Sequence, residues 1–177
     1  ERIVRDAVAR GVNYFDVAPT YGDVELKLGP ALVPYRKNVF LACKTTQRKR
    51  AEAEAELRHS LERLGTDHLD LYQLHALNDV EKDVKVALGK GGALEAFLAD
   101  KDLDVVTIAT PSGMHLEPAV AAAEHGKHVI CEKPLEVTLE RVDRMIAAHD
   151  KAGTKLGGVF NCRYEPVNQA IKSLMAA

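Results

Sequence analysis

Six short runs of β-branched and other apolar residues recur along the chain, separated by stretches with the period of a helix. The runs cover residues 12–17, 39–44, 69–75, 105–109, 128–131 and 155–160. Parallel strands need crossover connections, and strands this uniformly apolar require cover on both faces. The pattern therefore predicts an α/β protein with about six parallel strands alternating with helices. With 177 residues the chain accommodates six such units, whereas an eight-stranded barrel typically takes about 250 residues.

The intervening segments carry signals for helix ends and for buried helix faces. Stripes at Leu57, Leu61 and Leu64 and at Leu139, Val142 and Ile146 have helical spacing and predict two buried faces. Thr138 is expected to cap the last long helix. Four glycines are expected to end helices in the left-handed conformation: Gly11, Gly65, Gly126 and Gly153. The polar and then glycine-rich stretch 77–92 is predicted to be a long loop.

Composition excludes several classes of partner. The formal net charge of −2 offers no general basic footprint for nucleic acid, and no apolar run is long enough to cross a membrane. Cys43, Cys131 and Cys162 are odd in number and lack metal-ligand spacing, so we expect reduced, packed thiols and no metal site. Reduced thiols favour a cytoplasmic location.

Polar side chains collect where the predicted strands end. Asp16 closes the first run, Tyr21 lies in the loop after it, and Lys44 and His75 end the next two runs. Carboxyl ends of parallel strands open onto one face, where ligands bind. An ammonium held by a carboxylate lowers the pKa of a nearby tyrosine, and a histidine can orient a carbonyl oxygen. The alternative is a buried Asp–Lys pair with an unrelated tyrosine and histidine.

The first half of the chain resembles the aldo-keto reductases. The order and spacing of residues 12–22, 39–45, 61–67 and 70–75 carry the resemblance, which covers about residues 1–97. It implies half of a TIM barrel, in which Asp16, Tyr21, Lys44 and His75 match the family's catalytic tetrad. Tyr21 would then be the general acid for carbonyl reduction by NADPH. The last barrel strands, which supply much of the cofactor-binding site in that family, have no counterpart in this sequence.

The second half, about residues 98–177, resembles the glucose-fructose oxidoreductase/inositol dehydrogenase family (Gfo/Idh/MocA). Residues 103–115, 126–135 and 155–164 carry this resemblance. It implies the second half of a Rossmann domain that binds NAD or NADP, with a catalytic Lys133 near nicotinamide and substrate. The resemblance also implies cofactor-binding residues on two strand-end segments: Thr110, Pro111, His115, Glu132 and Pro134. If a nicotinamide cleft is present, we expect Lys133 and His115 to open onto the same strand-end face as His75.

The glycine-rich first turn of a complete Rossmann domain has one weak candidate in this sequence. Residues 89–92 read Gly-Lys-Gly-Gly, but they follow a loop rather than a strand and lack a third Gly or Ala at position 94. We therefore predict a plain loop at this position, without a role in holding phosphate.

Taken together, the sequence indicates a TIM-barrel-like half joined to a Rossmann-like half near residues 93–102, packed as one continuous unit. Successive right-handed βα units would place all six strands in one sheet with helices on one face. We expect a homodimer to cover the uncovered sheet face. The predicted function is NAD(P)-dependent hydride transfer to or from a small, sugar-like carbonyl or alcohol substrate. The alternative is a chimeric folded scaffold without catalytic activity.

Overall fold

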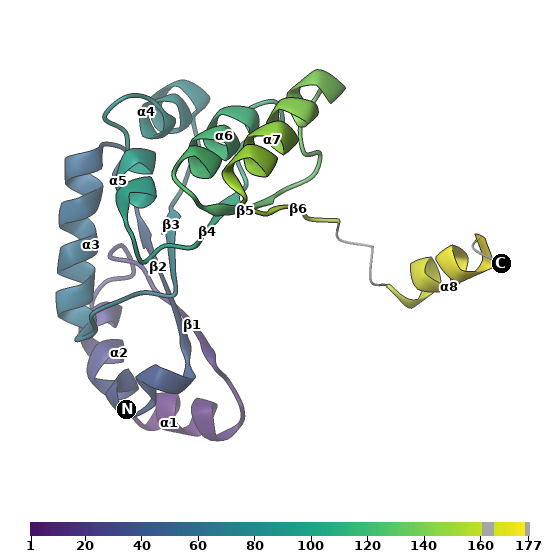
Figure 1. The fold of residues 1–177 in the computed structure, drawn as a ribbon. Coiled ribbons are helices and arrows are strands. Elements are labelled where there is room, and N and C mark those ends of the chain that lie inside the picture. Colours follow the sequence, from purple (N-terminus) through teal and green to yellow (C-terminus); the bar gives the residue numbers. More distant parts are fainter. Residues whose placement is uncertain (161–164, 176–177) are drawn as a thin grey trace. The chain divides into compact units, whose positions relative to one another are not determined.

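The computed structural model describes residues 1–160 and 165–175, and the chain divides into two compact units. Unit 1 comprises Glu1–Ala96 and unit 2 comprises Phe97–Ala177. Each unit contains strands that alternate with helices (Figure 1). We describe the two units separately.

Unit 1 is built around a parallel sheet with the strand order β1-β2-β3. The strands are β1 (Tyr14–Asp16), β2 (Phe40–Thr45) and β3 (Leu71–Leu74). The helical segments are α1 (Arg2–Ala9), α2 (Val24–Leu32), the 3₁₀ helix η1 (Val33–Asn38), α3 (Arg50–Leu64), the π-helix η2 (Val80–Val84) and α4 (Lys85–Leu88). Helix α5 (Ala93–Ala99) crosses the boundary between the units.

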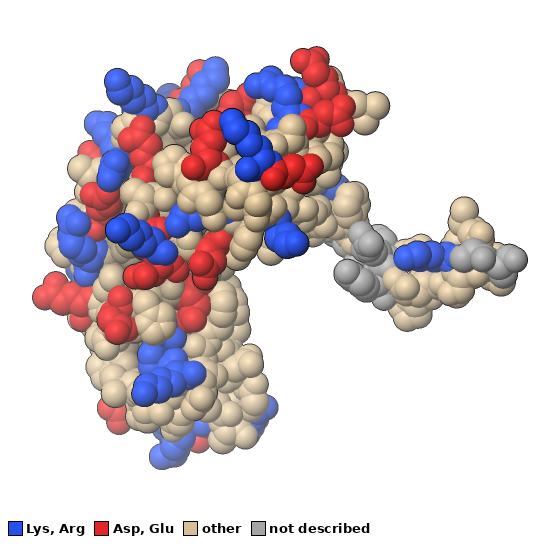
Figure 2. Space-filling model, in the orientation of Figure 1, with Lys and Arg blue, Asp and Glu red and all other residues tan. Residues whose placement is uncertain are grey.

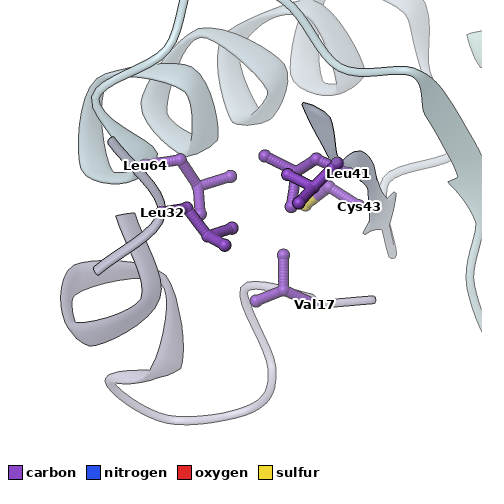
Figure 3. Close-up of a cluster of buried hydrophobic side chains, with 6 residues drawn as sticks. Val17, Leu32, Leu41, Cys43 and Leu64 are labelled. Atoms are coloured by element: carbon purple, nitrogen blue, oxygen red, sulfur yellow. The ribbon is translucent and has the colours of Figure 1, made fainter. Parts of the chain in front are cut away.

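One face of this sheet packs against α2 and α3. Leu32 and Leu64 extend from the two helices toward Leu41 and Cys43 of β2, with Val17 completing the cluster (Figure 3). The strand alternation turns the next residues to the opposite face. There Tyr14 and Phe40 are directly opposite each other, and their exposed rings stack with centroids 5.2 Å apart. This buried cluster of unit 1 thus lies on the side of the sheet that faces α2 and α3.

Unit 2 repeats this arrangement with a second parallel sheet, in the order β4-β5-β6. Its strands are β4 (Val105–Ile108), β5 (His128–Cys131) and β6 (Leu156–Gly158), and its helices are α6 (Leu116–Glu124), α7 (Leu139–Ala152) and α8 (Pro166–Met175). Helices α6 and α7 lie on the same side of the sheet (Figure 1). Ile108, Val129, Cys131 and Met145 are buried, whereas Ile130, which points the other way from β5, is exposed.

The local predictions are largely confirmed. All six predicted runs contain a strand, and all four glycines expected at helix ends have positive φ angles. The hydroxyl of Thr138 accepts a hydrogen bond from the N–H of Arg141, so Thr138 caps α7 as predicted. Cys43 and Cys131 are free, buried thiols, whereas Cys162 lies outside the described residues. Within the described ranges, the helices are too short or too polar to cross a membrane.

The prediction of one six-stranded sheet is wrong, because β3 and β4 do not pair and the strands form two three-stranded sheets. The connection between them is not a single crossover helix but contains η2, α4 and α5. The prediction of a long loop over residues 77–92 is therefore also wrong. Asp79 caps η2 by accepting hydrogen bonds from two backbone N–H groups, and Val84 and Ala87 are buried.

One predicted helix face is rotated. Met145 and His149 form the buried face of α7, whereas Leu139 is 83% exposed and Ile146 is also exposed. The apolar stripe at Leu139, Val142 and Ile146 has the spacing of a buried face, but a different stripe of the same helix faces α6. The homodimer remains a prediction, although the six-stranded sheet from which it was inferred is absent.

Candidate functional site

The predicted tetrad lies at the carboxyl end of the sheet in unit 1. Asp16 is the last residue of β1, Lys44 is the next-to-last residue of β2, and His75 directly follows β3. Tyr21 lies in the loop that leads from β1 to α2. The parallel register explains the convergence, because Asp16 is opposite Ala42, two residues before Lys44, and Lys44 is opposite Gln73. Alternation then places Asp16 and Lys44 on the sheet face that is not covered by α2 and α3.

Lys44 contacts both of the groups expected to surround it. Its Nζ donates a hydrogen bond to Oδ1 of Asp16 in an ion pair. The same Nζ lies 5.2 Å from the centroid of the Tyr21 ring. The predicted contact of Lys44 with Asp16 and Tyr21 is therefore confirmed, whereas the catalytic role of the four residues, as opposed to an Asp–Lys pair with an unrelated tyrosine and histidine, remains a prediction.

The electrostatics of Lys44 favour its charged form. The side chain is only 12% exposed, and this burial by itself lowers the pKa of the ammonium. The hydrogen bond and the negative charge of Asp16 act in the opposite direction, with a smaller contribution from Tyr21, and the net result is a raised pKa for Lys44. The site therefore holds a fixed positive charge beside the tyrosine.

His75 completes the cluster from the third strand. Its ring meets the Tyr21 ring edge-on, with centroids 5.7 Å apart and an interplanar angle of 89°. Oγ1 of Thr20 lies 3.4 Å from Nδ1 of His75. Tyr21 is 43% exposed and His75 is half-buried, so the tyrosine and the histidine are accessible to a small molecule from solvent.

Two residues near this cluster escaped the sequence analysis. Thr20 contacts the ring of His75, and Arg48 binds the backbone carbonyl of His75. Only their positions in the sequence pointed to these two residues, since Thr20 directly precedes Tyr21 and Arg48 follows β2 by three residues. A threonine in a turn and an arginine in a basic run are too common for the sequence to single them out.

In unit 2, His115 joins the two strand-end segments that the sequence assigned to the cofactor. Its Nε2 lies 2.8 Å from the carbonyl oxygen of Thr110, after β4. Its Nδ1 lies 3.0 Å from the carbonyl oxygen of Pro134 and 3.2 Å from that of Leu135, after β5. The expectation that His115 opens onto the strand-end face is wrong, because the residue is 1% exposed and both ring nitrogens face backbone oxygens.

The N-terminus of α6 is filled by a carboxylate from the same unit. Oε2 of Glu136 accepts hydrogen bonds from the backbone N–H groups of His115 and Leu116, at 3.1 and 3.0 Å. Burial raises the pKa of Glu136, but backbone hydrogen bonds and the Arg141 guanidinium outweigh this effect and lower it. Because an anionic group already occupies this helix end, the N-terminus of α6 does not fit a cofactor phosphate.

The remaining predicted residues of unit 2 lie nearer the surface. Lys133, Pro111 and Pro134 are exposed, and Thr110 and Glu132 are half-buried. The hydroxyl of Thr110 donates to the carbonyl of Met114, and Glu132 accepts from the backbone N–H of Lys133. The exposed ammonium of Lys133 is therefore the charged group in these segments best placed to meet a ligand.

The glycine-rich stretch 89–92 forms a loop, as predicted, and its backbone is used internally. The N–H of Gly91 donates to Glu95, and its carbonyl accepts from the N–H of Arg50. A Cβ at Gly92 would lie 2.3 Å from the carbonyl oxygen of Ala87, so this position requires glycine for a close approach of two backbones. Packing thus explains these glycines without a phosphate.

The surface carries charges of both signs. Figure 2 shows acidic and basic side chains interspersed over the visible face, in keeping with the net charge of −2. Such intermixing gives no broad field of one sign to steer a polyanion.

Comparison with known proteins identifies one family. The Gfo/Idh/MocA model, an oxidoreductase family with an NAD-binding Rossmann fold, matches residues 45–159, more than half of the chain. The match begins before residue 98, where the sequence placed the start of this resemblance, so the boundary near residue 98 remains a prediction. The aldo-keto reductase resemblance of the first half also remains a prediction.

Individual relatives are similar over part of the chain. A 1,5-anhydro-D-fructose reductase of Ensifer adhaerens is 37% identical over 84 residues, which cover 48% of this chain and 25% of that protein. A myo-inositol 2-dehydrogenase of Thermotoga maritima is 36% identical over 118 residues, 59% of this chain and 35% of that protein. The chain thus spans about a quarter to a third of these relatives. A WlbA dehydrogenase of Chromobacterium violaceum, solved with NADH and UDP-GlcNAcA, aligns over 93% of this chain and 40% of its own, with 26% identity and a TM-score of 0.47.

Proposed function

Because the chain belongs to the Gfo/Idh/MocA oxidoreductase family, with its NAD-binding Rossmann fold, we propose that it is an NAD(P)-linked oxidoreductase. The reaction is hydride transfer between nicotinamide and a carbonyl or alcohol group of a small, sugar-like substrate. One observation carries the proposal, namely the convergence of Asp16, Tyr21, Lys44 and His75 at one accessible strand-end edge. Relatives named as sugar and polyol enzymes support the substrate class.

The four side chains divide the acid–base work. The hydroxyl of Tyr21 donates a proton to the carbonyl oxygen during reduction and accepts it back during oxidation. The ammonium of Lys44, beside the tyrosine ring, stabilises the negative charge that develops on the phenol oxygen. Asp16 holds that ammonium in place, and His75, edge-on to Tyr21, donates an N–H to orient the substrate oxygen. This is the arrangement that the aldo-keto reductase resemblance implies for these residues.

A nicotinamide cofactor supplies or accepts the hydride when bound. The exposed Lys133 ammonium and the neighbouring turn at Thr110 and Pro111 fit the polar part of such a molecule, and His115 keeps the two segments adjacent. The N-terminus of α6 does not fit its phosphates, because the Glu136 carboxylate takes the N–H groups there. We therefore propose that Lys133, Thr110 and Pro111 contact the cofactor within unit 2.

The test has a binding arm and a catalytic arm, both with the full chain. NADH and NADPH are titrated while nicotinamide fluorescence is followed, and reduction of small aldehydes and keto sugars is then assayed. Tyr21→Phe should lower the reduction rate by about 10²–10⁴-fold with little change in cofactor affinity. Tyr14→Phe is the matched control, since Tyr14 lies on the same sheet face without contacting Lys44 in the described structure. Lack of cofactor binding at millimolar concentration would overturn the enzyme assignment.

A second candidate is a folded chimeric scaffold without turnover. It is favoured by the internal use of backbone N–H groups that could otherwise bind an anion, at the α6 N-terminus and in the loop 89–92. We also propose a cytoplasmic location, which the free, buried thiols of Cys43 and Cys131 support. The binding arm of the experiment separates the scaffold from the enzyme, because only the enzyme requires the cofactor.

A further inference from the structure

Arg48 lies just beyond β2 and reaches across to the end of β3. Its side chain is 12% exposed. Nη2 donates to the carbonyl oxygens of His75 and Ala76, at 2.7 and 3.0 Å, and Nη1 donates to that of Thr46 at 2.9 Å. One side chain therefore binds three backbone oxygens on two neighbouring strand ends, including the carbonyl of a candidate site residue.

The backbone at this point requires such support. Ala76, directly after His75, has a φ angle of 55°, and it is the one non-glycine residue with positive φ in the described ranges. A residue with a Cβ is disfavoured in this left-handed region. Nη2 of Arg48 donates to the carbonyls of both His75 and Ala76. These two hydrogen bonds stabilise the left-handed conformation of Ala76, which is otherwise disfavoured. The planar guanidinium supplies several donors in fixed directions, which a lysine does not.

Asp83 fixes Arg48 from the other side. Its Oδ1 accepts from Nε of Arg48 at 3.1 Å, and its Oδ2 accepts from the backbone N–H groups of Asn78 and Asp79, at 2.9 and 3.0 Å. The segment that leaves β3 is thus closed into a loop, with Asp83 at one end and the carbonyl of His75 at the other. The two side chains hold the whole turn that follows the strand.

We propose that Arg48, held by Asp83, is a positioning residue for His75, acting through the His75 and Ala76 carbonyls to fix the direction of the imidazole toward Tyr21. Thr20 contacts the ring itself at Nδ1, so the histidine is set from its backbone and from its ring. A ring that is edge-on to Tyr21 depends on both contacts. The catalytic role of His75 rests on the proposed function, whereas the positioning of its ring by Arg48 does not.

The experiment measures that geometry directly in the full chain. The ring signals of the seven histidines are recorded by two-dimensional proton–nitrogen NMR, and His75→Gln identifies the His75 signal. We compare Arg48→Gln and Asp83→Asn with Arg50→Gln as the matched control, because Arg50 pairs with Glu54 and Glu95 on the surface. Hydrogen exchange of the 78 and 79 amides follows the turn, and thermal melting checks that each variant folds.

Arg48→Gln should shift or broaden the His75 ring signal and speed amide exchange at residues 78 and 79 by about 10-fold or more, while Arg50→Gln changes neither. Asp83→Asn should change the His75 signal less, because Arg48 keeps its bonds to the carbonyls, but it should speed exchange of the 78 and 79 amides at least as much, because Asp83 accepts from them directly. An unmoved His75 signal in a folded Arg48→Gln variant would overturn the proposal. If that variant does not fold, an unmoved signal in Asp83→Asn has the same consequence. Neither readout needs cofactor or turnover, so failure of the proposed function is recognised separately.

Discussion

The Glu136 carboxylate offers a quantitative test of how the strand-end segments of unit 2 are held. It accepts hydrogen bonds from the backbone N–H groups of His115, Leu116 and Val137, at 3.1, 3.0 and 2.9 Å, and its side chain is fully buried. Glu136→Ala removes both carboxylate oxygens, so all three hydrogen bonds are lost and the first N–H groups at α6 are left unsatisfied. With about 1 kcal/mol for each hydrogen bond, we expect a loss of about 3 kcal/mol in the stability of unit 2.

Hydrogen exchange read by mass spectrometry suits this measurement, because it resolves unit 2 from unit 1 within the full chain. A loss of about 3 kcal/mol corresponds to about 100-fold faster exchange of the α6 amides. Glu140→Ala is the matched control, since Glu140 is an exposed residue in the first turn of α7. An effect of Glu136→Ala no larger than that of the control would refute the reasoning.

The same group predicts a dependence on pH. Hydrogen bonding and Arg141 leave the pKa of Glu136 lowered in the folded chain despite the opposing effect of burial. The unfolded chain therefore binds the proton more readily, and the stabilisation is present above the unfolded pKa of about 4.3. It should disappear as the pH falls through the lower folded pKa. In the Glu136→Ala variant, hydrogen exchange of the α6 amides should lack the acceleration at low pH that protonation of Glu136 causes.

Two further predictions concern packing and protonation. Gly29→Ala should destabilise unit 1 by about 2 kcal/mol, although alanine normally favours a helix. The reason is that a Cβ at position 29 would lie 2.6 Å from the carbonyl oxygen of Leu64. Urea unfolding followed by tyrosine fluorescence measures the loss, and equal or higher stability of the variant would contradict the prediction. Burial lowers the pKa of His149, so unit 2 should lose stability below the unfolded histidine pKa of about 6.5. Hydrogen exchange of α6 should show a smaller loss in His149→Gln, and an equal loss would exclude His149 as the cause.

The sequence predicted what depends on neighbouring residues. Strand runs, glycines at helix ends and the Thr138 cap are local features, and the structure contains them at the predicted positions. The contact of Lys44 with Asp16 and Tyr21 was also predictable, because consecutive parallel strands place their carboxyl ends side by side. Such a prediction requires only that strands consecutive in the sequence are neighbours in the sheet.

The features that the sequence did not predict depend on distant contacts. Whether β4 would pair with β3 cannot be inferred from either strand alone, and the two sheets show that it does not. In the segment 77–92, Val80, Val84 and Ala87 have helical spacing, but they are few among polar residues and glycines. Polar contacts of Asp79, Arg48 and Asp83, which the sequence does not reveal, help to order η2 and α4. For α7, two stripes of similar spacing compete, and only packing against α6 selects Met145 over Leu139.

The two strand-end regions show why a matching motif does not assign a role to each of its residues. In unit 1 the predicted residues face one another at an accessible edge, and Tyr21 and His75 remain open to a ligand. In unit 2, His115 is buried and binds backbone carbonyls of both segments, whereas Lys133 is exposed. The histidine therefore holds the two segments together and is closed to solvent, whereas the lysine is open to solvent. Burial and hydrogen-bond partners, rather than membership in the motif, distinguish the two residues.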